Sequence, residues 1–279
     1  MNKFIIENFG DIRSFLDTIG KRETNCIFKS VSSLASQDGS KGFTMTANYS
    51  ESVELMGKGY KEGLDGLKKC KGVKVNCTGN TCKKLPQTGI AGYAPHVPNA
   101  VAGIPQNMIS HAIVKQPSKV ITIVYDICAS SSVSADRFIK AGRNLLDVIT
   151  MLELKGYRVA LDVQASVYAK SEIAICRVNV KNHRQMMNPL KIAYPLLHPS
   201  FLRRQIFKWL ETSPKLSEPK FTQGYGIPLA LKYDGRTDEF RAYLQGNGFL
   251  GKDVYFSNIY EAERHSAEEL VSLMGIKKK

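Results

Sequence analysis

The chain has 279 residues, of which 43% are apolar and 23% are charged, so its composition is that of a folded globular protein and excludes wholesale disorder. No apolar run approaches the roughly 20 residues that cross a bilayer, and the N-terminus lacks the apolar stretch of a secretory signal. We therefore expect no membrane partner and a cytoplasmic location. The length suits one large domain, or a core domain with an appended region.

The charge is strongly basic, with 39 Lys and Arg residues against 25 Asp and Glu, a formal net charge of +14. Such an excess favours an anionic partner, either nucleic acid or an acidic protein surface. The alternative is a solvated surface that only prevents self-association.

The first 66 residues predict a mainly helical region. Apolar residues at helical spacing indicate a helix over 8–19, and Cys26–Phe28 reads as a short strand. A Gly/Ser/Asp cluster at 36–42 predicts a loop, and Ser50 is a candidate N-cap for the helix that follows.

Residues 67–85 concentrate lysine and cysteine, which indicates an exposed basic hairpin or loop. Residues 86–110 contain four prolines and several glycines, so we expect extended or turning backbone there and no helix. We assign residues 1–115 to an N-terminal α+β region that carries the basic, Cys-containing loop.

A βαβ unit is predicted over residues 118–182. Lys119–Tyr125 reads as a buried strand, and Ser134 can cap an amphipathic helix that Gly156 ends. Tyr157–Val163 and Ile173–Val180 predict two further strands. A strand, helix and strand with short links imply a right-handed crossover and parallel pairing.

The rest of the chain continues this pattern. It predicts a helix over Phe201–Leu210, a strand at Asp253–Phe256, and a last helix that Ser266 and Glu269 open as a capping box. The predicted fold class is α/β, a mostly parallel sheet flanked by helices, formed by residues 116–279 with the N-terminal α+β elaboration before it.

Polar side chains follow the first strand of this unit. Asp126, Cys128 and Ser130 alternate, so they can converge beyond the carboxyl end of the strand, where open α/β sheets bind ligands. A carboxylate and a serine hydroxyl suit a hard divalent cation. The alternative is a polar turn that leads into the helix capped by Ser134.

This segment resembles the von Willebrand factor A family, whose first strand ends in Asp-x-Ser-x-Ser and continues into an amphipathic helix and a paired strand. The resemblance implies that Asp126 and Ser130 hold Mg²⁺, with a partner's carboxylate completing the coordination. Cys128 stands where that family has a serine, so the motif is degenerate here.

A wider pattern is similar to an uncharacterised family of tailed-bacteriophage proteins, which have this N-terminal region before a strand, a Ser-rich turn and a helix. The resemblance implies a phage origin and no particular activity. The segments that carry it are Tyr49–Met56, Gly59–Gly63, Gly92–Pro98 and Gly103–Ile109.

Four residues can supply zinc ligands: Cys70, Cys77, Cys82 and His96. Their spacings contain no Cys-x-x-Cys pair, which most structural zinc sites have, so a basic loop without metal is the alternative. The other cysteines, Cys26, Cys128 and Cys176, sit among apolar residues and are expected in the core.

Candidate nucleic-acid contacts come from the basic loop and from the predicted helix near residue 205, because several cations on one face are needed to bind a phosphate backbone. Trp209 is expected in the core rather than as a stacking platform. The candidate cations are Lys68, Lys69, Lys71, Lys74, Lys83, Lys84, Arg203, Arg204 and Lys208.

Nucleophilic and phosphate-loop motifs are absent from the sequence, since it has neither a Gly-x-Ser-x-Gly elbow nor a complete Gly-x-x-x-x-Gly-Lys-Ser/Thr loop. The sequence therefore favours a non-enzymatic, phage-encoded binding or assembly protein that acts on protein or nucleic acid, in the host cytoplasm or in a virion. A metal-dependent enzyme acting on nucleic acid, with carboxylates such as Asp126, Asp162 and Asp253, is the first alternative. A host-directed inhibitor is the second.

Overall fold

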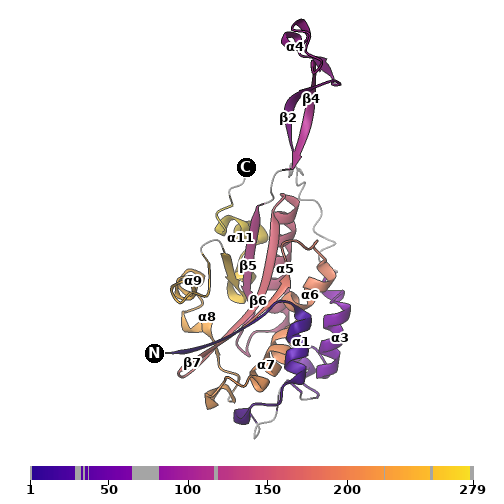
Figure 1. Ribbon diagram of the computed structural model, residues 1–279. Coiled ribbons are helices and arrows are strands. Elements are labelled where there is room, and N and C mark those ends of the chain that lie inside the picture. Colours follow the sequence, from indigo (N-terminus) through magenta and orange to yellow (C-terminus); the bar gives the residue numbers. More distant parts are fainter. Residues whose placement is uncertain are drawn as a thin grey trace.

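The computed structural model describes residues 2–28, 33, 35–36, 38–64, 82–115, 119–222, 224–251 and 254–276. It has two parts, a body built on a six-stranded sheet and an arm that projects from it (Figure 1). No helix in these ranges is long and apolar enough to span a membrane.

The main sheet is mixed and mostly parallel, with strand order β1-β7-β6-β5-β9, and β8 pairs with β6. Three of its pairings are parallel, β1 with β7, β5 with β6 and β5 with β9, whereas β6 runs antiparallel to β7 and to β8. The carboxyl ends of β1 and β7 therefore lie at the opposite edge from those of β5, β6 and β9. The strands are β1 (Lys3–Phe9), β5 (Val120–Asp126), β6 (Arg158–Ala169), β7 (Glu172–Lys181), β8 (Ile227–Pro228) and β9 (Val254–Asn258).

The predicted strand, helix and strand of the βαβ unit are confirmed with their parallel pairing, whereas the third predicted strand, β7, is antiparallel to its neighbour β6. Helix α5 (Ala135–Leu154) joins β5 to the parallel β6, with Ser134 at its N-cap. Gly156 follows the helix with φ of +86°, the left-handed conformation in which glycine ends a helix without strain. The late strand β9 and the Ser266–Glu269 capping box of α11 (Ala267–Leu273) are confirmed as well.

The N-terminal region differs from the expectation. Residues 3–9 form a strand rather than a helical lead-in, and its register with β7 pairs Lys3 with Glu172 and Phe9 with Val178. This strand is part of the main sheet, so the sheet crosses the division that the sequence suggested at residue 115. Cys26–Phe28 is a 3₁₀ turn instead of a strand, and Asn48 rather than Ser50 caps the following helix.

Helices cover both faces of the sheet (Figure 1). Phe9 meets Phe15 of α1 at 5.1 Å between ring centroids, whereas Phe4 meets Tyr243 of α9 at 6.0 Å. Because these two strand residues are five positions apart, their side chains point to opposite faces. The helices of the body besides α5 and α11 are α1 (Ile12–Lys21), α2 (Lys41–Thr44), α3 (Tyr49–Lys58), α6 (Pro189–Leu197), α7 (Phe207–Thr212), α8 (Leu229–Lys232), α9 (Thr237–Gly246) and α10 (Ile259–Arg264).

The arm is a separate three-stranded sheet, β2 (Cys82–Gly89), β4 (Met108–Lys115) and β3 (Ala94–Pro95), with the short helix α4 (Val97–Val101) at its tip. The expectation of no helix over 86–110 was therefore wrong at α4, where Pro98 stands in the first turn, a position that tolerates proline. Figure 1 shows the arm standing clear of the body. Gly92 is required at the tip, because a Cβ there would lie 2.1 Å from the carbonyl oxygen of Ile109.

Candidate functional site

The turn after β5 holds Asp126 in a fully buried position. One carboxylate oxygen, Oδ1, accepts a hydrogen bond of 2.8 Å from the backbone N–H of Cys128. The other, Oδ2, is buried with no hydrogen-bond partner among the described residues. Burial raises the pKa of Asp126 to about 7, because the charged form loses its hydration.

The neighbouring positions of the turn are occupied by bonds within the protein. Cys128 is buried, and desolvation raises the pKa of its thiol well above the ordinary value. The backbone N–H of Ser130 donates to the hydroxyl of Tyr260 at 3.0 Å, and its side chain contacts Ser132 Oγ at 3.2 Å.

These residues do not fit the Mg²⁺ that the von Willebrand A resemblance implies. Mg²⁺ takes an octahedral set of oxygen ligands, commonly one or two carboxylates and several waters. This turn offers one carboxylate, whose Oδ1 already accepts from the Cys128 N–H, and a thiol, and both side chains are buried away from water. The described part of the chain contains no group of three or more His, Cys, Asp or Glu side chains that could hold a metal ion. We therefore assign the turn a structural role.

The zinc prediction falls mostly outside the described residues. Cys70 and Cys77 lie in the range 65–81, and only the backbone of Cys82, at the start of β2, is described. His96 caps α4, where its Nδ1 accepts from the Asn99 N–H at 3.4 Å. Zinc binding stays a prediction.

The predicted nucleic-acid contacts do not gather on one described surface. Lys68, Lys69, Lys71 and Lys74 lie outside the described residues, and so do the side chains of Lys83 and Lys84. Lys208 is half-buried on α7.

Arg203 and Arg204 are buried inside the protein rather than displayed on a helix face. They lie on the π-helix η4 (Phe201–Ile206), and the side chain of Arg203 donates to the carbonyl oxygens of Phe43 (2.6 Å) and Val133 (2.5 Å). Arg204 donates to Thr46 Oγ1 (2.7 Å), to the Thr46 carbonyl (2.9 Å) and to the Ala35 carbonyl (3.0 Å). Burial lowers the pKa of Arg203 to about 10. Both guanidinium groups therefore donate hydrogen bonds to the segment around residues 35–46, and neither lies on a binding surface.

The core predictions for Trp209, Cys128 and Cys176 are confirmed, since all three are buried. The prediction for Cys26 was wrong, because this thiol is exposed. The indole of Trp209 donates to Glu7 Oε2 at 2.7 Å, which explains how its one polar atom is satisfied in the interior.

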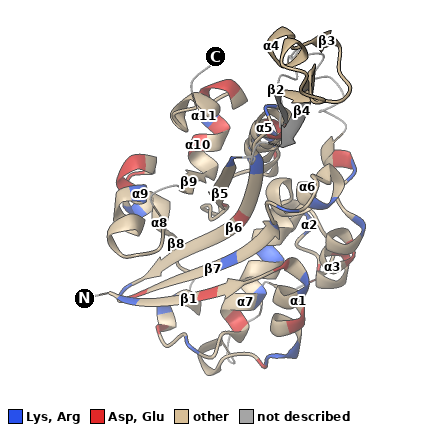
Figure 2. Ribbon diagram, turned by 45° about the horizontal axis from the view of Figure 1, so that its top comes forward, with Lys and Arg blue, Asp and Glu red and all other residues tan. Residues whose placement is uncertain are grey.

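The tip of the arm is the feature that sequence reasoning missed. Of the eleven large apolar side chains that are exposed in the described structure, five lie between residues 90 and 104. No Lys, Arg, Asp or Glu occurs from Leu85 to Val114, and Figure 2 shows the tip without a charged residue. In a chain of net charge +14, thirty residues without a charge are unusual, and this stretch is the sequence signal that could have identified the tip. The five side chains are Ile90 (81% exposed), Tyr93 (66%), Val97 (62%), Val101 (84%) and Ile104 (43%).

The tip is also an ordered structure. The Tyr93 N–H donates to the Ile109 carbonyl at 2.9 Å, the His96 N–H to the Asn107 carbonyl at 2.6 Å, and Asn99 Nδ2 to the Gln106 carbonyl at 2.9 Å. These bonds hold the backbone in one shape while the apolar side chains remain in water, which is typical of a preformed contact surface.

Comparison with known proteins gives one match. The family described as "Domain of unknown function (DUF7192)" matches residues 2–278, which includes the body and the arm. No curated protein and no solved structure matches the chain. The chain therefore belongs to the DUF7192 family.

Proposed function

We propose that this chain is a non-enzymatic binding or assembly protein of a bacteriophage, with a von Willebrand A-like body, and that it engages a protein partner through the tip of its arm. The observation that carries the proposal is the uncharged, apolar and ordered tip. The phage origin rests on the sequence resemblance alone. Either an assembly partner or a host protein that is inhibited would suit the same surface.

The chemistry of the tip favours protein over nucleic acid. Binding to a phosphate backbone needs cations, and the tip has none. Burying one of its exposed aliphatic side chains in a partner would contribute about 1.5–3 kcal/mol. Nucleic-acid binding by the basic residues elsewhere stays a prediction, as does the metal-dependent enzyme.

The test compares proteins captured by the full chain with those captured by two variants, Val101→Asp and Ile90→Asp. A charge at the contact should weaken partner binding by at least ~tenfold, so a specific partner is lost from both variants. Leu273→Asp is the matched control, because Leu273 is an exposed apolar residue (51%) on the body. Capture that is the same for all four proteins would overturn the proposal.

A salt series with nuclease-treated protein separates the alternatives. Binding to nucleic acid that weakens steeply with salt, unchanged in the two tip variants, would support a nucleic-acid role of the body. Cleavage of the nucleic acid that requires Mg²⁺ would favour the enzyme instead.

A further inference from the structure

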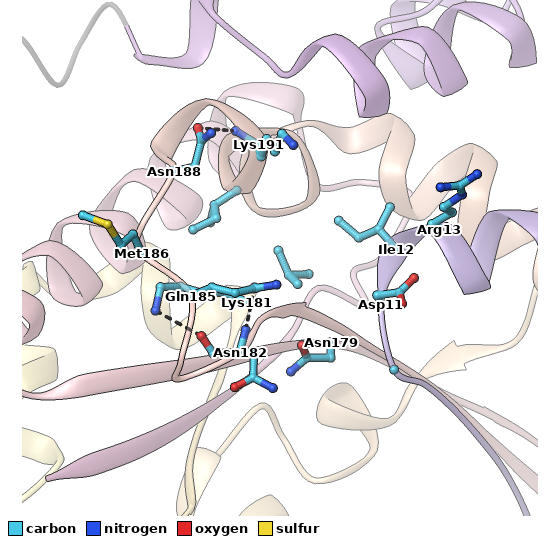
Figure 3. Close-up of a pocket in the computed structure, with 13 residues that line it drawn as sticks. Asp11, Ile12, Arg13, Asn179, Lys181, Asn182, Gln185, Met186, Asn188 and Lys191 are labelled. Atoms are coloured by element: carbon cyan, nitrogen blue, oxygen red, sulfur yellow. Dashed lines mark hydrogen bonds between the residues drawn. The ribbon is translucent and has the colours of Figure 1, made fainter. Parts of the chain in front are cut away.

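A cavity of about 620 Å³ opens at the edge of the sheet opposite to Asp126, beyond the carboxyl ends of the parallel neighbours β1 and β7. Its walls come from the turn between β1 and α1 and from the connection between β7 and α6 (Figure 3). Parallel strands commonly present ligand sites in such a position. None of its lining residues belongs to the arm, so this inference is independent of the proposed function.

The side-chain amides in this cavity have a fixed orientation. The Asn182 N–H donates to Gln185 Oε1 at 3.0 Å, the Arg184 N–H to Asn182 Oδ1 at 3.0 Å, and the Lys191 N–H to Asn188 Oδ1 at 3.4 Å. Because a backbone N–H can only donate, the amide atom that faces it must be oxygen. The NH₂ groups of Asn182, Gln185 and Asn188 are therefore left as donors.

The charges at the cavity add to this excess of donors. Arg13 and Lys191 are exposed and form no ion pair with a described residue, and Figure 3 shows both along the rim. Lys181 is buried and already neutralised, since its ammonium contacts Glu153 Oε1 at 2.8 Å and the Val159 carbonyl at 2.7 Å. Asp11 is the one acidic residue among the described residues of the lining, and its Oδ1 accepts from the Ser14 N–H at 2.7 Å.

We propose that this cavity binds a small phosphorylated compound of nucleotide size. The two cations without an ion pair among the described residues, together with three amide NH₂ groups, match the oxygen acceptors of a phosphate, and charge-assisted bonds of this kind are the strong ones. A volume of 620 Å³ lies within the range of small-molecule sites. Asp11 is placed to accept from a hydroxyl of the same ligand.

The test is calorimetric titration of the full chain with pyrophosphate, with ADP, and with a short single-stranded oligonucleotide. We expect saturable binding of pyrophosphate or ADP at one site per chain. Arg13→Gln combined with Lys191→Gln should weaken it at least ~tenfold. The matched control combines Lys140→Gln with Lys220→Gln, which removes two exposed charges that do not line the cavity and should preserve the affinity. Lys140 lies on α5, and Lys220 lies near the start of β7, at the end of that strand away from the cavity.

A second variant separates lost binding from lost folding. Asn188→Asp keeps an oxygen that can cap α6 but replaces the NH₂ donor by a carboxylate oxygen, so it should abolish binding while the melting temperature is retained. Failure of the wild type to bind either small probe would overturn the proposal, and so would equal weakening in the control pair. A third outcome is that the wild type binds the oligonucleotide but neither small probe, and that the Arg13→Gln/Lys191→Gln variant does not bind it. That outcome would assign these donors to a nucleic-acid backbone and overturn the small-molecule site.

Discussion

At the scale of single residues, the buried polar side chains of this protein differ in whether they have partners. Asp126 has an oxygen without a partner among the described residues, whereas Arg204 has three described acceptors. The two residues therefore predict opposite effects when their charges are removed.

Asp126→Asn should make the protein less sensitive to pH. The folded-state pKa of about 7 lies above the ordinary 3.8, so protonation favours the folded state. Its contribution to stability is fully present below about pH 4 and is lost as the pH rises through about 7. The total is at most about 4 kcal/mol, since each pKa unit corresponds to about 1.4 kcal/mol.

Urea unfolding at pH 4.5 and pH 8 measures this effect. The asparagine variant keeps an acceptor for the Cys128 N–H but does not titrate, so it should gain stability relative to the wild type as the pH rises. An identical pH dependence in the two proteins would show that the carboxyl group is ionised in the folded state.

Arg204→Met should lower the free energy of unfolding by about 2–4 kcal/mol, because it leaves buried carbonyl and hydroxyl groups without a donor. Lys208→Met, on the half-buried cation one turn later, should change it by less than about 0.5 kcal/mol. Chemical denaturation of both variants gives the comparison. Equal effects would mean that the bonds of Arg204 to the segment around Thr46 contribute little.

At the scale of elements, the contact of α5 with α6 depends on a glycine. A Cβ at Gly142 would lie 2.4 Å from the carbonyl oxygen of Leu196, so the two helices approach through this position. Gly57 in α3 is a helical glycine in open space, since a Cβ added there would have no described neighbour within 4 Å.

Gly142→Ala should therefore destabilise the protein by about 1–3 kcal/mol through overpacking. Gly57→Ala should be neutral or stabilising by up to about 1 kcal/mol, because alanine favours a helix more than glycine does. Thermal unfolding of the pair measures the difference. A stabilising Gly142→Ala would show that α5 and α6 can separate without cost.

The elements that the sequence predicted well are those whose stabilisation is local. The βαβ unit combines a buried apolar strand, an amphipathic helix and a terminating glycine within some forty residues. Strand β1 was missed because its pairing partner β7 begins at Glu172, and such long-range pairing leaves no local pattern. Arg203 and Arg204 were misplaced because charged residues in a helical stretch usually face solvent, and their carbonyl acceptors come from distant segments.

At the scale of the whole molecule, the protein separates a body with a buried core from an arm whose tip exposes apolar side chains. The body holds the continuous core, whereas no residue from 87 to 110 is buried. The candidate metal turn could be located from the sequence, but its failure to fit a cation depends on burial. The apolar tip and the donor-rich cavity both depend on which side chains the fold leaves exposed.

The central claim is that the arm tip is the partner-binding surface, and site-specific photo-crosslinking tests it most directly. Benzoylphenylalanine would replace Val101 at the tip or Met186 on the body, two side chains of matched exposure (84% and 86%). In cells that naturally produce the protein, we predict a discrete crosslinked protein from position 101 and none from position 186. Equal products at both positions, or no product at position 101, would contradict the account.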